Sequence, residues 1–295
     1  MRFWPRVFAV AFGTAALIGA AQLGLVYGLE AVRFNRPFAG VENDWNIHLT
    51  WMAWFAMTAV VGGTAFALGH AKLIARRQGI ESRHSDGRGV FVRIVAALAA
   101  GLGGLLSVVP LTVYPAVNAI LPTPHNPEYT MALTGIAAVV AGTILAATTA
   151  GNRPLSTSIA WFVAAAWVVA AASLSDTSPA KGRLYTEPVR LGVLDIGALM
   201  PTPRAHFSMP ALALVIGLIV AVTGWVRRQS RVLIALSGAT GPLLIALAYL
   251  MGGPGISRQM TNQADAYLGA MASVVVGLIP AIIVALLPKR AHQTL

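Results

Sequence analysis

Long apolar stretches alternate with short polar ones along almost the whole chain. Eight of the apolar stretches contain about 20 residues each, which is the length that a helix needs to cross a hydrocarbon core of roughly 30 Å. They lie near residues 7–30, 49–70, 90–112, 130–149, 157–174, 208–226, 232–251 and 266–287. Charged residues, proline and glycine mark their ends. The pattern predicts an all-α membrane protein, a bundle of about eight transmembrane helices in a single domain, residues 1–295.

A repeated stretch indicates how these helices are grouped. The sequence PTPHNPEYTMAL at 122–133 returns as PTPRAHFSMPAL at 201–212, each time just before an apolar stretch. Proline restrains such a connection because its ring fixes φ. Thr130 or Ser208 is expected to cap the first turn of the helix that follows. The repeat predicts four helical hairpins, in each of which one helix crosses the membrane outward and the next crosses it back.

Looser copies, HLTWMA at 48–53 and DAYLGA at 265–270, align with this repeat. The alignment gives one polar side chain at the equivalent position of each returning helix: His48, Glu128, His206 and Asp265. If the hairpins share an axis, these imidazoles and carboxylates suit zinc or another divalent ion. The alternative is that polar residues collect at helix N-termini, where the dipole favours acids, and do not converge. Both interpretations stay open, and the sequence assigns no cofactor.

The distribution of basic residues predicts the orientation of the helices. The chain has 21 Lys and Arg, 10 Asp and Glu, and a formal net charge of +11. Most of the basic residues fall in the segments on the same side as the N-terminus: Arg2, Arg6, Lys72, Arg76, Arg77, Arg83, Arg88, Arg93, Arg153, Arg227, Arg228, Arg231, Lys289 and Arg290. The positive-inside rule then places both termini in the cytoplasm. Because this rule accounts for the charge, no nucleic-acid partner is expected.

Composition and motifs narrow the possible chemistry. With 57% hydrophobic and only 11% charged residues, the chain is not a soluble domain, and with no cysteine it offers no thiolate nucleophile. The glycine-rich GLGGLL at 101–106 lies inside a predicted helix without a following Lys and Ser/Thr pair, so it predicts close helix packing. Ionisable residues are missing from the middle of the spans, which argues against a proton-driven pump. We name no catalytic residues and do not expect an enzyme.

The longest predicted outer segment, residues 176–206, contains the apolar run RLGVLDIGALM. This run is apolar enough to lie along the membrane surface. It is interpreted as an interfacial connector, with a lid or a docking patch as alternatives.

Two late stretches resemble a group of known proteins. RLGVLDI at 190–196 and SGATGPLLIALAYLMGGPG at 237–255, in an Ala-, Val- and Gly-rich chain, resemble uncharacterised multi-pass integral membrane proteins of actinobacteria. The resemblance implies a place in the plasma membrane and no known activity.

Three functions remain open at this point. The first is a non-catalytic scaffold or accessory subunit of an envelope complex. It would bind a membrane protein partner, and it would present the basic stretch at 72–93 to a cytosolic protein or to anionic lipid. The alternative is a transporter or permease for a small apolar or lipid-like molecule, since repeats of this kind surround a path in some carriers. The third is a membrane enzyme with a site at its outer face.

Overall fold

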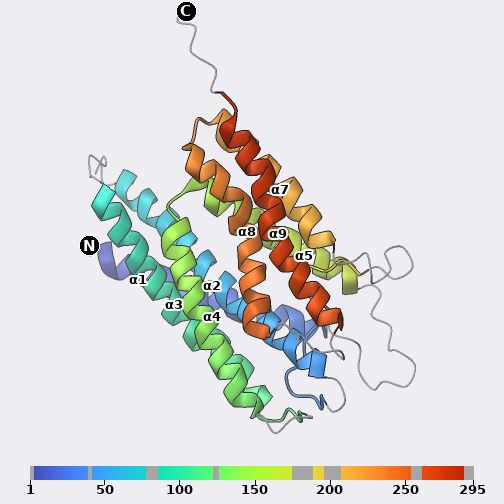
Figure 1. Cartoon of the computed structure of the whole chain (residues 1–295). Coiled ribbons are helices and arrows are strands. Elements are labelled where there is room, and N and C mark those ends of the chain that lie inside the picture. Colours follow the sequence, from blue (N-terminus) through green and yellow to red (C-terminus); the bar gives the residue numbers. More distant parts are fainter. Residues whose placement is uncertain are drawn as a thin grey trace, which may run out of the picture. The chain divides into compact units, whose positions relative to one another are not determined.

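A computed structural model describes residues 3–38, 42–77, 86–121, 126–174, 189–195, 207–253 and 261–288. These residues form eight helices that are long and apolar enough to cross a membrane, so the predicted all-α bundle is confirmed (Figure 1). The helices are α1 (Phe3–Gly28), α2 (Glu42–Arg77), α3 (Asp86–Ala116), α4 (Pro127–Thr149), α5 (Arg153–Leu174), α7 (Ser208–Val226), α8 (Arg231–Gly252) and α9 (Thr261–Leu286). Eight such helices indicate a multi-pass membrane protein.

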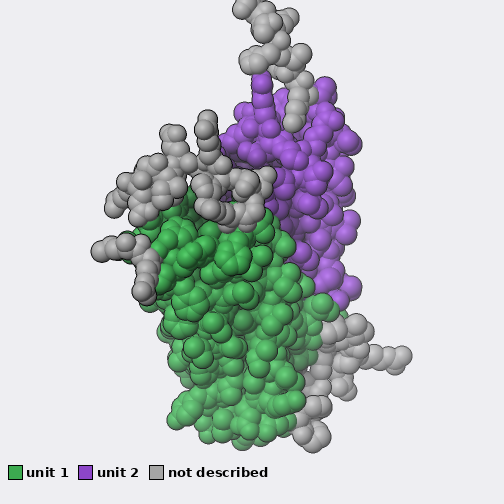
Figure 2. Space-filling view, turned by 90° about the vertical axis from the view of Figure 1, so that its left-hand side faces the viewer, with its two compact units in different colours: residues 1–151, 177–191, 247–264 green, residues 152–176, 192–246, 265–295 purple. Residues whose placement is uncertain are grey.

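The chain divides into two compact units (Figure 2). Unit 1 comprises Met1–Gly151, Thr177–Leu191 and Leu247–Ala264, and unit 2 comprises Asn152–Asp176, Gly192–Ala246 and Asp265–Leu295. The boundary falls within α8 and within α9, so each of these helices contributes residues to both units. The single domain, the four-hairpin grouping and the cytoplasmic termini stay predictions.

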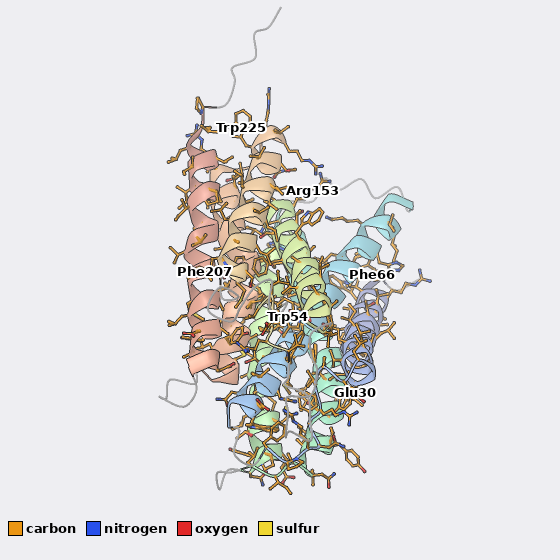
Figure 3. The ribbon with its side chains drawn as sticks, turned by 90° about the vertical axis from the view of Figure 1, so that its right-hand side faces the viewer. Glu30, Trp54, Phe66, Arg153, Phe207 and Trp225 are labelled. Carbon is orange, nitrogen blue, oxygen red and sulfur yellow. The ribbon has the colours of Figure 1, made fainter. Side chains whose placement is uncertain are left out.

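Helix α2 forms the core of unit 1, where α1, α3 and α4 all pack against it. Every residue at 51–60 is buried, including the largest side chains of the stretch, Trp51, Trp54 and Phe55. A helix that is apolar and buried on every side belongs to the interior of a bundle. Figure 3 shows Trp54 among the helices and Phe66, which is 61% exposed, at the margin.

Close packing in unit 1 depends on glycines at helix contacts. A Cβ atom added at Gly103 of α3 would lie 2.2 Å from the carbonyl oxygen of Phe12 in α1. One added at Gly63 of α2 would lie 2.9 Å from the carbonyl oxygen of Ala11. Small residues allow helix backbones to approach this closely in membranes. The packing role predicted for the glycines at 101–106 is therefore confirmed at Gly103.

Unit 2 uses the same principle where α7, α8 and α9 meet. A Cβ atom added at Gly238 of α8 would lie 2.0 Å from the carbonyl oxygen of Gly277 in α9, and one added at Gly277 would lie 2.2 Å from that of Gly238. A Cβ atom added at Gly217 of α7 would lie 2.8 Å from the same carbonyl oxygen of Gly277. The three helices thus touch through their backbones, and no side chain larger than hydrogen fits between them.

The predicted helix caps are wrong at both positions. Helix α4 is capped by Asn126, whose side chain accepts hydrogen bonds from the backbone N–H groups of Glu128 and Tyr129. The Thr130 hydroxyl instead donates to the carbonyl of Pro127 at 3.0 Å. Helix α7 has no side-chain cap, because the hydroxyl of Ser208 binds another segment described below. An amide one turn earlier satisfies the N–H groups of α4 better than a hydroxyl that already lies inside the helix.

Candidate functional site

A buried polar cluster lies at the Asp44 end of α2, where the loop at 29–38 packs against the helix. We call Arg36, Asp44, His48 and the backbone N–H of Arg33 the α2 polar cluster. His48 is 1% exposed. Its Nε2 accepts a hydrogen bond from the backbone N–H of Arg33 at 3.1 Å, and its Nδ1 lies 2.6 Å from the carbonyl oxygen of Asp44, to which it donates. Both ring nitrogens are therefore occupied by backbone groups, and the imidazole is held in one orientation.

Aromatic rings enclose this imidazole. Phe34 and Phe38 meet His48 edge to face, with ring centroids 5.6 and 5.0 Å from its own, and Trp45 packs against Phe38 at 5.1 Å. The loop is anchored a second time where the N–H of Phe38 donates to the carbonyl of Ile120 at 2.7 Å. Alternate loop positions, Phe34, Arg36 and Phe38, are thus buried, and the two phenylalanine rings cover the polar groups.

The charges of the α2 polar cluster are paired inside this enclosure. Nη2 of Arg36 lies 2.7 Å from Oδ2 of Asp44, with side chains only 9% and 13% exposed, and the guanidinium sits 5.0 Å from the centre of the Phe38 ring. A second pair, Arg33 with Glu30, is largely exposed and lies where the chain leaves α1. Removing one partner of a buried pair is costly because it leaves a charge without compensation. The buried pair therefore fixes the loop to α2.

The four residues predicted to share a metal ion have different surroundings. His48 uses both ring nitrogens as described, and Glu128 accepts a hydrogen bond from the side chain of Asn126 at 3.0 Å in the first turn of α4. Asp265 belongs to unit 2, whereas His48 and Glu128 belong to unit 1. His206 lies outside the described residues. Within the described ranges, no group of three or more His, Asp or Glu residues could hold a metal ion. Convergence of all four stays a prediction.

Residues 189–195, VRLGVLD, form a buried segment without helical structure. Val189, Leu191 and Val193 are 5%, 1% and 1% exposed. The prediction that the run beginning at Arg190 lies along the membrane surface is therefore wrong for the residues at 190–195. Backbone of this kind is tolerated among membrane helices only where protein covers it and satisfies its polar groups.

In unit 1 the buried segment is held by two aromatic side chains. The indole Nε1 of Trp51 in α2 donates to the carbonyl of Val189 at 2.6 Å. The hydroxyl of Tyr249 in α8 donates to the carbonyl of Leu191 at 2.8 Å. Both donors are buried, so these bonds are shielded from water.

In unit 2 two serines hold the rest of the buried segment. Ser208 Oγ donates to the carbonyl of Gly192 at 2.8 Å and accepts from the N–H of Leu194 at 3.2 Å. Ser173 Oγ in α5 lies 3.1 Å from the carbonyl of Val193 and accepts from the N–H of Asp195 at 3.1 Å. Each hydroxyl therefore contacts one carbonyl and one N–H group of the segment, as a neighbouring strand would.

The sequence contains a weak signal for this segment. Its apolar residues fall at alternate positions, which is typical of extended chain with one buried face. The anchors Ser173, Ser208 and Tyr249 lie near helix ends, where polar groups are common, and Trp51 lies in an apolar part of α2, so none of them stands out in the sequence. Only the folded chain reveals that they bind one segment.

A second polar contact lies between α1 and α2. The hydroxyl oxygen of Thr58 lies 2.9 Å from Oε1 of Gln22 and 2.7 Å from the carbonyl oxygen of Trp54, and it can donate its proton to either. The amide nitrogen of Gln22 donates to the carbonyl of Ile18 at 3.3 Å. The polar atoms of this contact therefore bind each other and their own helices.

Taken together, the α2 polar cluster and the buried segment bind parts of the chain to one another, and neither brings a nucleophile to His48. No protein-family model, curated protein or solved structure matches the chain.

Proposed function

We propose that this multi-pass membrane protein is a non-catalytic scaffold or accessory subunit of an envelope complex. The observation that carries the proposal is the filled interior of unit 1. Met52, Trp54, Phe55 and Met57 of α2 are all completely buried, so a path along α2 through unit 1 would need these side chains to move aside. A closely packed interior of this kind suits a rigid frame.

The hydroxyl groups of the interior support the same reading. Thr64 donates to the carbonyl of Val60 at 2.8 Å, and Thr112 donates to that of Val108 at 2.9 Å. Each hydroxyl is thus satisfied within its own helix. A hydrated path needs polar groups that face a common space, whereas these face their own backbones.

We propose that the stretch at 72–93 is the contact with the cytosolic side, through anionic headgroups or a cytosolic protein. Lys72 is exposed near the end of α2. Arg93 of α3 lies against the backbone at Gly151, since a Cβ atom added there would lie 2.4 Å from its Nη1. Each basic residue near an anionic surface contributes about 1 kcal/mol. We further propose that the protein resides in the plasma membrane, as its resemblance to actinobacterial membrane proteins implies.

Cysteine scanning of α2 separates the scaffold from the transporter, because the chain has no cysteine of its own. Ala53 and Ala56 are completely buried and accept a cysteine with little change in volume. We expect single cysteines at these positions to resist a water-soluble thiol reagent in native membranes, whereas Lys72→Cys reacts. Leu17 of α1 is 70% exposed, so protein does not cover it. Leu17→Cys is therefore the control for a cysteine that fails to react only because lipid keeps water away from it.

Reaction at Ala53→Cys and Ala56→Cys, with protection by an apolar solute, would favour the transporter over the scaffold.

A second measurement addresses the partner directly. Protein expressed from its own gene and extracted in mild detergent should run as one species larger than protein overproduced alone. Charge neutralisation at Lys72, Arg76 and Arg77 should reduce that species if the stretch at 72–93 holds the partner. A single species of the same size in both preparations would contradict the scaffold proposal.

A further inference from the structure

A buried side chain in unit 1 lacks a partner for one of its polar atoms. Gln263, near the start of α9, is 0% exposed, and its Oε1 has no hydrogen-bond partner among the described residues. A buried amide oxygen without a donor costs about 1–3 kcal/mol. The polar groups around the other end of the amide, at Nε2, bear on what Gln263 binds.

Three further oxygen groups surround the Gln263 amide. Its Nε2 lies 3.4 Å from both Thr50 Oγ1 and the carbonyl oxygen of Gly253, which is long for a hydrogen bond. Thr50 gives its own proton to the carbonyl of Asn46 at 2.9 Å, so its lone pairs remain available. The side-chain amide of Asn46 also lies close, with Nδ2 3.7 Å and Oδ1 3.8 Å from the place of a Cβ atom on Gly253. We call Asn46, Thr50, Gly253 and Gln263 the oxygen cluster.

Two glycines at the end of α8 bring its last carbonyls onto α2. A Cβ atom added at Gly252 would lie 2.1 Å from Thr50 Oγ1, so only glycine allows this approach. Gly253 has a φ of 93°, a left-handed conformation that glycine adopts without strain. The carbonyl end of a helix carries partial negative charge and favours a cation.

We propose that the oxygen cluster binds a monovalent cation of the size of Na⁺. A half-turn of the Gln263 amide exchanges its two ends. Oε1 then points toward Thr50 and Gly253 in place of the two long Nε2 contacts, and Nε2 takes the position that Oε1 has now. Calcium, which is close to sodium in size, holds oxygen ligands at about 2.3 to 2.6 Å, so ligands at right angles are separated by about 3.2 to 3.7 Å. The 3.4 Å separations around the amide fall in this range.

The charge of the ion follows from the ligands. Hydroxyl, amide and peptide oxygens are neutral, and the oxygen cluster contains no carboxylate. Calcium sites in proteins rely on Asp and Glu to balance the double charge, and an uncompensated buried charge is costly. A single positive charge beside the carbonyl end of α8 is therefore the better match. This site goes beyond the scaffold proposal and does not depend on it.

Thermal unfolding of the detergent-purified protein tests the site. The melting temperature is measured while NaCl, KCl, CaCl₂ or N-methyl-D-glucamine chloride is titrated at constant ionic strength. A ligand that binds only the folded state raises the melting temperature with a saturable dependence on its concentration. We expect such a rise with Na⁺ and none with N-methyl-D-glucamine.

Variants assign the effect to the oxygen cluster. Gln263→Leu and Thr50→Val should lose the Na⁺-dependent rise, and Thr50→Ser should keep it because the hydroxyl remains. Gln263→Glu should move the rise to lower Na⁺ concentration, since a carboxylate strengthens cation binding. Thr64→Val, which removes a buried hydroxyl of α2 that binds only Val60, is the matched control and should respond like the unmodified protein.

Several outcomes would overturn the proposal. An equal response to all four salts would mean that Oε1 accepts from a buried water and that no cation binds. A Na⁺ response retained in both Gln263→Leu and Thr50→Val would place the ion elsewhere. If Gln263→Leu fails to fold, an unchanged Na⁺ midpoint in Gln263→Glu gives the same negative answer. A response to Ca²⁺ at lower concentration than to Na⁺ would refute the single charge.

Discussion

One imidazole links the loop after α1 to the first turns of α2. The ring of His48 accepts from the N–H of Arg33 and lies between Phe34 and Phe38. A ring of similar size without nitrogens keeps the aromatic contacts and removes only the hydrogen bonds. The His48→Phe variant therefore measures the polar contribution of the residue separately from its packing.

We predict that His48→Phe lowers the free energy of unfolding by about 1–3 kcal/mol, because the buried N–H of Arg33 loses its acceptor. The measurement is thermal or denaturant unfolding in detergent, followed by tryptophan fluorescence. His70→Phe is the control, since His70 is only half-buried in the same helix and its replacement should change stability by less than about 0.5 kcal/mol. Equal stability of the two variants would refute the structural role of His48.

The two ion pairs near this ring should respond differently to mutation. Arg36→Met leaves Asp44 charged and buried, which costs about 3–5 kcal/mol, whereas Glu30→Gln removes an exposed pair worth about 0.2–1 kcal/mol. The double variant Arg36→Met with Asp44→Leu should recover most of the loss, because no unpaired charge remains. A chemical denaturation series on the four proteins checks this order. A double variant as unstable as Arg36→Met alone would contradict it.

At the scale of helices and segments, contacts between backbones set the tolerance to substitution. A methyl group at Gly238 meets the carbonyl of Gly277 across the contact between α8 and α9. Gly69 of α2, by contrast, has nothing within 4 Å of the position of an added Cβ atom. The same substitution, glycine to alanine, therefore reports on packing at Gly238 and on the intrinsic helix preference of the residue at Gly69.

We predict that Gly238→Ala destabilises the protein by about 1–3 kcal/mol, since the helices must separate or distort to accept the methyl group. Gly69→Ala should instead stabilise it by about 0.5–1 kcal/mol, because alanine favours the helix more than glycine. Melting temperatures of the two variants in the same detergent provide the comparison. Changes of the same sign would show that the Gly238 contact does not limit packing.

The buried segment at 189–195 gives a prediction about access. A single cysteine at Leu191 should resist thiol reagents, because the position is only 1% exposed. Adding Tyr249→Phe removes the hydroxyl that binds the Leu191 carbonyl, and the rate of modification should then increase. Adding Tyr129→Phe, which alters a largely exposed ring in α4, should leave the rate unchanged. Fast reaction of the cysteine without a second change would mean that the segment is not buried.

The helices were predictable from the sequence because apolar length is a local property. The span expected at 208–226 coincides with α7, while the span expected at 49–70 is extended at both ends in α2 (Glu42–Arg77). Hydropathy locates the apolar part of a helix, but backbone hydrogen bonds continue into polar turns such as the one that contains Asp44. The buried segment and the oxygen cluster were missed because they depend on single contacts between distant residues, for example Trp51 with Val189.

For the whole molecule, the predicted orientation places both termini in the cytoplasm. Single cysteines at Ala180 and Ser82 test it, because the native chain contributes no background reaction. An impermeant thiol reagent applied to intact cells should modify Ala180→Cys and spare Ser82→Cys, which should react only after the membrane is permeabilised. The charge bias between alternate loops is the reason for this expectation. Modification of Ser82→Cys alone in intact cells would mean that the orientation is the opposite of the predicted one.

The anchoring of the buried segment has a consequence for the order of events on the ribosome. Trp51 and its acceptor at Val189 are 138 residues apart, and Thr50 and Gln263 are 213 residues apart. At about 5–20 residues per second, the acceptor for Trp51 is synthesised on the order of ten seconds after the helix that needs it. The central helix of unit 1 is therefore synthesised early, and the indole N–H of Trp51 has no acceptor at Val189 until that residue is made. A nascent chain stopped between these points would expose that unfinished helix to membrane proteases.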